Sequence, residues 1–131
     1  MPFQCTVVTP EQQVMDETVT QAILPAHDGQ LGILTGRAPI LVKLGVGSLR
    51  IDVQGGQSRT FFVDGGIAQM KGERLTILTD EATPAAEVDA ETAKAEYAEA
   101  NARIPTDEKT KKDREHAMKR ALAKQALVAA R

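Results

Sequence analysis

The chain has 131 residues, of which 42% are hydrophobic and only 3% aromatic, and its formal net charge at pH 7 is −2. A nearly neutral charge gives no basic surface for nucleic acid or an anionic membrane, and so few aromatic rings provide no stacking platform for a single strand. The length fits one small domain, or a small domain with an appendage, with a core of Leu, Ile, Val and Ala.

Short strands are predicted over the first part of the chain. Alternating or apolar runs cover residues 3–7, 48–53, 58–63, 67–70 and 75–78. Gly55-Gly56 favours a hairpin turn between the second and third runs, and Lys71-Gly72-Glu73 favours another between the last two. Each strand buries one face, as in a two-layered antiparallel architecture. We therefore predict an antiparallel β-sandwich, or flattened barrel, over residues 1–85.

Cys5 is the single cysteine, so it cannot form an internal disulfide. It alternates with Phe3 and Val7, and we expect a small core residue without a redox role. The sequence has no N-terminal basic segment before an apolar stretch, and no run of about 18 apolar residues. We therefore expect neither a signal peptide nor direct membrane insertion, and any membrane association has to come through a partner.

The segment from Ile23 to Leu44 combines turn residues with short apolar pairs. Its glycines are Gly29, Gly32 and Gly36, and its prolines are Pro25 and Pro39. Glycine permits positive φ, and proline fixes φ and removes a backbone donor, so the pattern predicts a chain that reverses direction repeatedly. No side chain in this segment suits covalent catalysis.

Composition changes near Asp80, where alanine becomes frequent, and Ala82–Ala85 reads as a linker. Asp89 is predicted to cap a helix that ends at Pro105, and Thr106 to cap a second helix. Because the connection is short, residues 86–131 are expected to form an antiparallel helical hairpin. The first helix has a mostly alanine stripe at spacings of four and three, made of Ala86, Ala90, Ala93, Tyr97, Ala100 and Ile104. Alanine buries little area, so the hairpin should be marginally attached and easily moved.

The two helices carry opposite charge. Residues 80–108 hold nine acidic and two basic side chains, whereas residues 109–131 hold eight basic and two acidic ones. The basic helix is either a solvated face that complements the acidic helix, or a docking surface for an acidic partner. The candidate docking residues are Lys111, Lys112, Arg114, Lys119 and Arg120.

No constellation of reactive groups can be assembled from the sequence. His27 and His116 lie in different segments, and no second His or Cys gives metal-ligand spacing. Gly45-Val46-Gly47 and Gly65-Gly66 lack the Lys-[Ser/Thr] of a phosphate-binding loop and the third glycine of a dinucleotide fingerprint. We therefore expect no catalytic, metal, nucleotide or cofactor site, and a protein that is not an enzyme.

Two segments resemble the epsilon subunit of the F-type ATP synthase. The first is the turn-rich run, through Leu24, Pro25, Asp28, Gly29, Leu31, Gly32, Ile33, Gly36, Ala38, Pro39, Ile40 and Leu41, followed by Gly47–Ile51. The second is Phe62–Ala68, where the family has a hydrophobic-x-x-GG-hydrophobic element. With the length and the helical tail, the resemblance covers essentially the whole chain. It is specific in the first two-thirds and loose in the last third.

The resemblance implies a non-catalytic central-stalk (rotor) subunit of a proton-translocating ATP synthase. The family's sandwich attaches to the gamma subunit and to the c-ring, so the complex would hold this chain peripherally at the cytoplasmic face of the bacterial inner membrane. The loop after Asp28-Gly29 is where the family approaches the ring. Structural turn chemistry is an equally good explanation for the glycines and prolines here. The contact candidates carried over are Gln30, Leu31, Gly32, Arg37, Ala38 and Pro39.

The family's hairpin swings between a compact form on the sandwich and an extended form that blocks ATP hydrolysis. The resemblance therefore implies that the basic second helix of this chain docks on the alpha and beta catalytic subunits. Some members bind ATP there through an [IL]-D-x-x-R-A motif. Here the motif reads Val88-Asp89-Ala90-Glu91-Thr92-Ala93, and Thr92 replaces the arginine that would meet phosphate. No nucleotide site is therefore expected. The alternative function is a free-standing adaptor that binds a helical protein partner.

Overall fold

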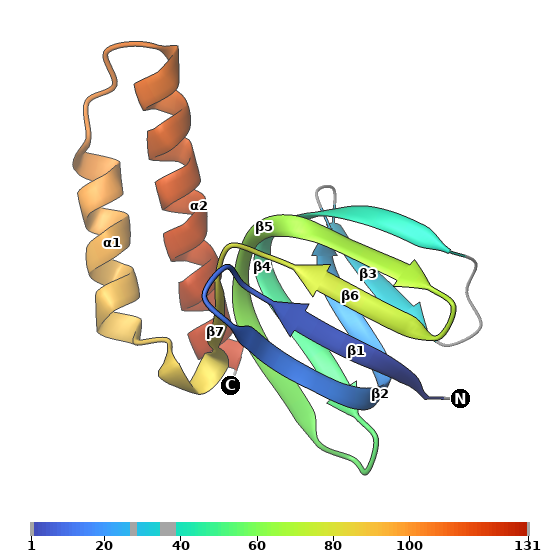
Figure 1. The fold of residues 1–131 in the computed structure, drawn as a ribbon. Coiled ribbons are helices and arrows are strands. Elements are labelled where there is room, and N and C mark those ends of the chain that lie inside the picture. Colours follow the sequence, from blue (N-terminus) through green and yellow to red (C-terminus); the bar gives the residue numbers. More distant parts are fainter. Residues whose placement is uncertain (1, 27–28, 35–38, 131) are drawn as a thin grey trace.

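The computed structural model describes residues 2–26, 29–34 and 39–130, and Figure 1 shows their arrangement. These residues form a seven-stranded sheet, one short 3-10 helix and two α-helices. The elements in chain order are β1 Phe3–Val8, β2 Gln13–Ala26, β3 Gly29–Leu34, β4 Ile40–Val53, β5 Ser58–Lys71, β6 Arg74–Leu78, β7 Ala82–Pro84, η1 Ala85–Glu87, α1 Ala90–Ala102 and α2 Glu108–Ala130.

The sheet closes on itself. Its strand order is β1-β6-β5-β4-β2-β3, and β1 also pairs with β2, so five of the strands form a ring. The predicted β-sandwich, or flattened barrel, followed by a helical hairpin is confirmed. One strand pair departs from the antiparallel order, because β1 runs parallel to β6. No hairpin turn connects these two strands, so no local sequence signal set their relative direction.

Two long strands turn the corner between the layers. In β5 the residues that join the core between the layers are Phe61 and Val63 before Gly65-Gly66, but Ala68 and Met70 after it. In β4 the buried residue Leu44 is likewise followed by Leu49 and Ile51. The inward-facing position thus changes from odd to even in β5 and from even to odd in β4. Each strand therefore contributes one half to each layer, with the bend next to its glycines.

The core lies between the two layers. Cys5 is fully buried in it, as predicted, beside the large side chains Phe3, Leu24, Ile33, Leu49, Ile51, Met70, Leu75 and Ile77. Burial raises the pKa of the Cys5 thiol to about 12, and the nearby charge of Asp16 acts in the same direction. At neutral pH such a thiol is protonated and a poor nucleophile.

The helical hairpin follows the prediction with two corrections. Asp89 caps α1 as predicted, since its carboxylate accepts the Thr92 backbone N–H at 3.0 Å. The prediction that Thr106 caps α2 is wrong, because Asp107 accepts the Thr110 N–H at 2.8 Å, and the Thr106 N–H donates to the Thr110 hydroxyl. Ile104 does not belong to the helical stripe. It lies beyond the end of α1 and is 86% exposed.

The hairpin contacts the strands mainly through α2. In Figure 1, α2 lies between α1 and the sheet, and the loop joining the helices projects away from the strands. The C-terminal half of α2 reaches β4, β5 and η1, whereas α1 packs on α2 through the buried Ala93 and Ala100. The hairpin thus rests on the sheet along a short contact.

Candidate functional site

The contact between α2 and the sheet is centred on Phe62. This side chain is on the outer face of β5, yet it is fully buried, because Val88 and Leu127 cover it. Partly buried apolar side chains complete the cluster, namely Val46, Ala85, Ala123 and Val128. The cluster is small and separate from the core between the layers. It therefore attaches the hairpin through little apolar area.

Three α2 side chains at four-residue spacing extend this contact with charge. Arg120 donates to the carboxylate of Asp64 on β5 and, through Nη2, to Glu81 Oε1 at 2.9 Å. His116 Nε2 lies 3.1 Å from Asp64 Oδ1. Lys124 Nζ lies 3.2 Å from Glu96 Oε2 on α1. Spacing by four places the three side chains on one face of the helix, directed at acidic groups of two neighbours.

Arg120 and Lys124 also cover the aromatic ring beneath them. The Arg120 Cζ lies 5.3 Å and the Lys124 Nζ 5.2 Å from the centroid of Phe62. Both distances fall in the range of cation–π attraction. Partial burial opposes the charge of Arg120, but the hydrogen bonds that it donates to Asp64 and Glu81 outweigh this effect, so the pKa of the guanidinium is raised. Arg120 is therefore held as a cation in this contact.

The two acidic partners of Arg120 are themselves fixed by the strands. Asp64 is only 16% exposed in its side chain and comes directly before the glycine bend of β5. Glu81 comes directly before β7, and its second carboxylate oxygen accepts the hydroxyl of Thr83 at 3.2 Å. The pairing of these residues was not predicted from the sequence. The only signal for it was the spacing of His116, Arg120 and Lys124.

A shallow hollow of about 170 Å³ lies beside the start of α1, lined in part by Glu87, Asp89, Thr92, Glu96 and Lys124. It contains the segment that departs from the ATP-binding motif. The Asp89 carboxylate accepts both the backbone N–H and the hydroxyl of Thr92, the latter at 2.6 Å. Three carboxylates surround one ammonium group here, an arrangement that disfavours a polyphosphate.

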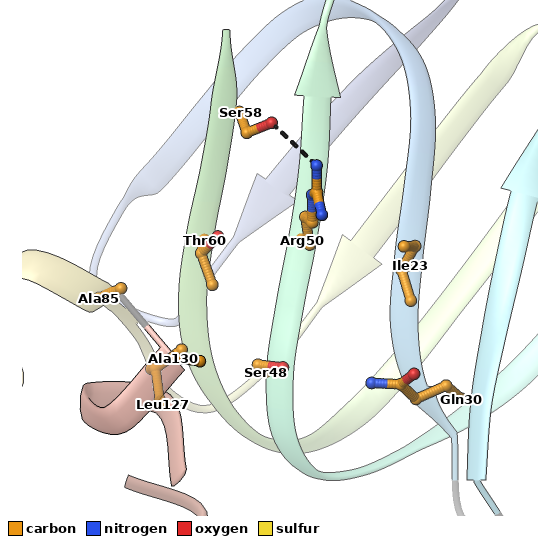
Figure 2. A pocket seen from close by; sticks show the side chains of 9 residues that line it. All are labelled: Ile23, Gln30, Ser48, Arg50, Ser58, Thr60, Ala85, Leu127 and Ala130. Carbon is orange, nitrogen blue, oxygen red and sulfur yellow. Dashed lines mark hydrogen bonds between the residues drawn. The ribbon is translucent and has the colours of Figure 1, made fainter. Parts of the chain in front are cut away.

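A larger hollow of about 420 Å³ lies between the outer faces of β2, β4 and β5 and the end of α2. Figure 2 shows Arg50 beside Ser58 in it, with Leu127 and Ala130 on the α2 side. The Arg50 Nε is bonded to Asp52 at 3.1 Å, and Ser58 donates to the same carboxylate oxygen at 2.7 Å. The one cation of this hollow therefore already has a partner. Within the described ranges, no three His, Cys, Asp or Glu residues could hold a metal ion together.

The described ring-contact candidates lie on β3 and directly before β4. Gln30 is exposed on β3, Leu31 packs partly against the core, and Gly32 is half-buried on the same strand. Pro39 is exposed directly before β4. β3 is the last strand of its path and pairs with β2. Arg37 and Ala38 lie outside the described residues, as does His27.

The predicted docking residues divide into two groups. Lys111, Lys112 and Lys119 are exposed on α2. Arg114 donates to the backbone and side-chain oxygens of Asn101 at 3.2 Å, and Arg120 is engaged with the strands. The structure therefore does not bring the five together as one free surface.

A closed sheet with a helical hairpin folded onto it, and contacts made of packing and ion pairs, define a binding subunit. The family model of the ATP synthase delta/epsilon chain beta-sandwich domain matches residues 2–85. The ATP synthase epsilon chain of Granulibacter bethesdensis is 37% identical over 103 residues, which are 79% of this chain and 76% of that protein. That of Gloeothece citriformis is 37% identical over 131 residues, 95% of this chain and 93% of the relative.

The fold agrees with solved structures. A chain of the Euglena gracilis mitochondrial ATP synthase, in a structure of OSCP/F1/c-ring in rotational state 1, aligns with a TM-score of 0.87 at 23% identity. The alignment covers 99% of this chain and 82% of that chain. The chain belongs to the ATP synthase epsilon family. It is accordingly a non-catalytic, peripheral subunit of a membrane-associated complex. Among the described residues, no helix is long and apolar enough to cross a membrane.

Proposed function

We propose that this chain is the rotor subunit that links gamma to the c-ring in a proton-translocating F-type ATP synthase. The observation that carries the proposal is the match of the whole sandwich, residues 2–85, to the family model. The Gloeothece relative also aligns through the helices. A solved Tetrahymena thermophila chain with a similar fold belongs to a structure titled central stalk/c-ring, at a TM-score of 0.75.

We assign the ring contact to β3 and the start of β4, which carry Gln30 and Pro39. Gln30 offers a polar side chain on a strand whose second edge has no partner strand among the described residues. Leu31 and Gly32 belong to the same strand, and Arg37 and Ala38 complete the proposed contact set.

We assign the gamma contact to exposed apolar side chains on the outer face of β4, β5 and β6. Ile67 on β5 and Leu78 on β6 are cross-strand partners, 42% and 43% exposed, and Leu41 on β4 is 68% exposed. Gln69, two residues after Ile67, pairs with Leu41, so all three apolar side chains are on one face. An exposed apolar group of this kind suits a protein partner.

Residues 1–85 form the attachment domain in this proposal, and residues 86–131 form a mobile regulatory hairpin. The hairpin's small apolar contact supports this division. When the hairpin moves outward, Lys111, Lys112, Arg114, Lys119 and Arg120 become available together for acidic surfaces of the alpha and beta subunits. The chain is placed at the cytoplasmic face of a bacterial inner membrane.

The experiment is gel filtration of the purified chain with gamma. A stable one-to-one complex is expected, and Ile67→Asp should weaken it because a charge would enter the apolar contact. Leu122→Asp is the matched control, since Leu122 is an equally exposed apolar residue on α2. Absence of a complex with the unmodified chain would refute the proposal. Equal complexes from both variants would refute the assignment of the gamma surface.

A further inference from the structure

We propose that Arg120 is an electrostatic latch that holds the hairpin on the sheet by bridging Asp64 and Glu81 without any ligand. The inference rests on the proposed mobility of the hairpin. It names the interaction that sets the balance between the attached and released forms in this particular chain.

Among the described cations of α2, Arg120 alone forms ion pairs with acidic residues of two strand segments. Asp64 is on β5 and Glu81 directly precedes β7, and the two fork ends of the guanidinium reach one carboxylate each. A forked guanidinium gives a directional contact that an ammonium group does not provide. Both acids are partly shielded from water, which strengthens their attraction to the cation relative to an exposed pair.

The surrounding charges favour the same position. His116 on α2 faces Asp64 on β5, whereas Lys124 on α2 faces Glu96 on α1. The ion pair of Lys124 therefore joins the two helices and not the hairpin to the strands. Removing Arg120 would leave Asp64 with His116 and Glu81 with the Thr83 hydroxyl. No other described basic residue reaches Glu81 within salt-bridge distance.

The apolar part of the contact explains why the latch is needed. Release of the hairpin exposes the Phe62 ring, but few other large side chains are uncovered with it. Arg120 and Lys124 also lie over that ring, so the charged and apolar parts separate together. An acidic partner surface that binds Arg120 must displace Asp64 and Glu81. Arg120 therefore cannot bind an outside partner and hold the hairpin on the sheet at the same time.

The test measures the distance between spin labels at Gln57→Cys and Glu115→Cys in the isolated full chain. Both positions are exposed, and buried Cys5 does not compete for the label. The chain without further changes should give one distance population, that of the attached form. Arg120→Gln should raise the ratio of released to attached molecules at least about fivefold. Lys119→Gln, which removes the same charge one residue earlier, should leave the ratio unchanged.

An exchange of partners separates a latch from simple loss of packing. The variant that combines Asp64→Arg and Arg120→Asp with Glu81→Gln, which removes the like charge from Glu81, should restore the attached population, whereas each single reversal should favour the released form. An unchanged distance in Arg120→Gln, or no restoration in the exchange variant, would overturn the latch. Gamma plays no part in this measurement, so such a result would leave the rotor proposal standing, and failure to bind gamma would not affect the latch.

Discussion

Gly66 provides a sharp test of the bend that carries Asp64 and Phe62 toward the hairpin. An ideal Cβ at this position would lie 2.1 Å from the carbonyl oxygen of Leu78 and 2.8 Å from the Cα of Thr79. Its φ of +113° is also unfavourable for any L side chain. Gly65 has a φ of +74°, but a Cβ there would meet no atom within 4 Å. Gly65→Ala therefore measures backbone strain alone, and Gly66→Ala measures strain with a backbone collision.

The expected difference follows from what the collision displaces. Strain at one such residue costs about 1–3 kcal/mol in either variant. In Gly66→Ala the end of β6 has to move away, which breaks the Thr79 hydroxyl bond to the Gly65 carbonyl at 2.7 Å. It also strains the Thr79 N–H bond to Val8 at 3.0 Å. Losing one such buried bond adds about 1–3 kcal/mol. Gly66→Ala should thus be less stable than Gly65→Ala by at least about 1 kcal/mol.

Urea unfolding followed by far-UV circular dichroism measures this difference through the midpoints, provided that the m-values agree. Failure of Gly66→Ala to fold while Gly65→Ala folds would agree with the same reasoning. Equal midpoints for the two variants would refute it, because the carbonyl of Leu78 would then not limit the site.

Three further predictions concern the core, the hairpin contact and the division of the chain. Since burial raises the pKa of Cys5 from 9.0 to about 12, the unfolded chain loses this proton first as pH rises. The free energy of unfolding should therefore fall between these pH values, by at most about 1.4 kcal/mol per pH unit. In urea titrations at alkaline pH, Cys5→Ala should show a shallower fall. An identical fall in both would contradict the burial of a protonated thiol. Leu127→Ala should weaken the hairpin contact by about 2–5 kcal/mol, and faster hydrogen exchange in α2 would report it. Leu122→Ala, on the half-exposed side of the same helix, should change exchange little, and equal effects would contradict the packing described. Deletion of residues 86–131 should leave assembly with gamma intact and at most raise ATPase activity, measured on the reconstituted complex, whereas loss of assembly would refute the division of labour.

Much of the fold could be predicted from local patterns. Alternation located β1, the second half of β4, β5 and β6, Gly55-Gly56 and Gly72 located two hairpin turns, and Asp89 was identified as a cap. These features depend on a few consecutive residues. Alternation did not locate β2 or β3, and the predicted linker at residues 82–85 contains β7, which pairs with β5. The second cap was assigned to Thr106 because two adjacent capping residues compete there, and the Thr110 hydroxyl decides in favour of Asp107. Ile104 was placed in the helix although a residue before proline disfavours helical dihedrals, and α1 ends at Ala102.

Features that join distant segments were not predictable. The parallel pairing of β1 with β6 joins residues about 70 positions apart, for which no turn signal exists. Arg120 was identified as a basic residue, but its partners Asp64 and Glu81 are 56 and 39 positions away. The charge pattern left two interpretations open, a solvated face that complements the acidic helix and a docking surface for an acidic partner. In the structure, Arg120 instead pairs with two acidic residues of the same chain.

The rotor assignment is tested most directly by photo-crosslinking in the intact ATP synthase. A photoreactive amino acid at Gln30 should form crosslinks to c-ring or gamma subunits. The same group at Gln57, in the turn between β4 and β5, should form far fewer. An assembled complex in which position 30 crosslinks to no subunit would contradict the assignment, because Gln30 would then face only solvent.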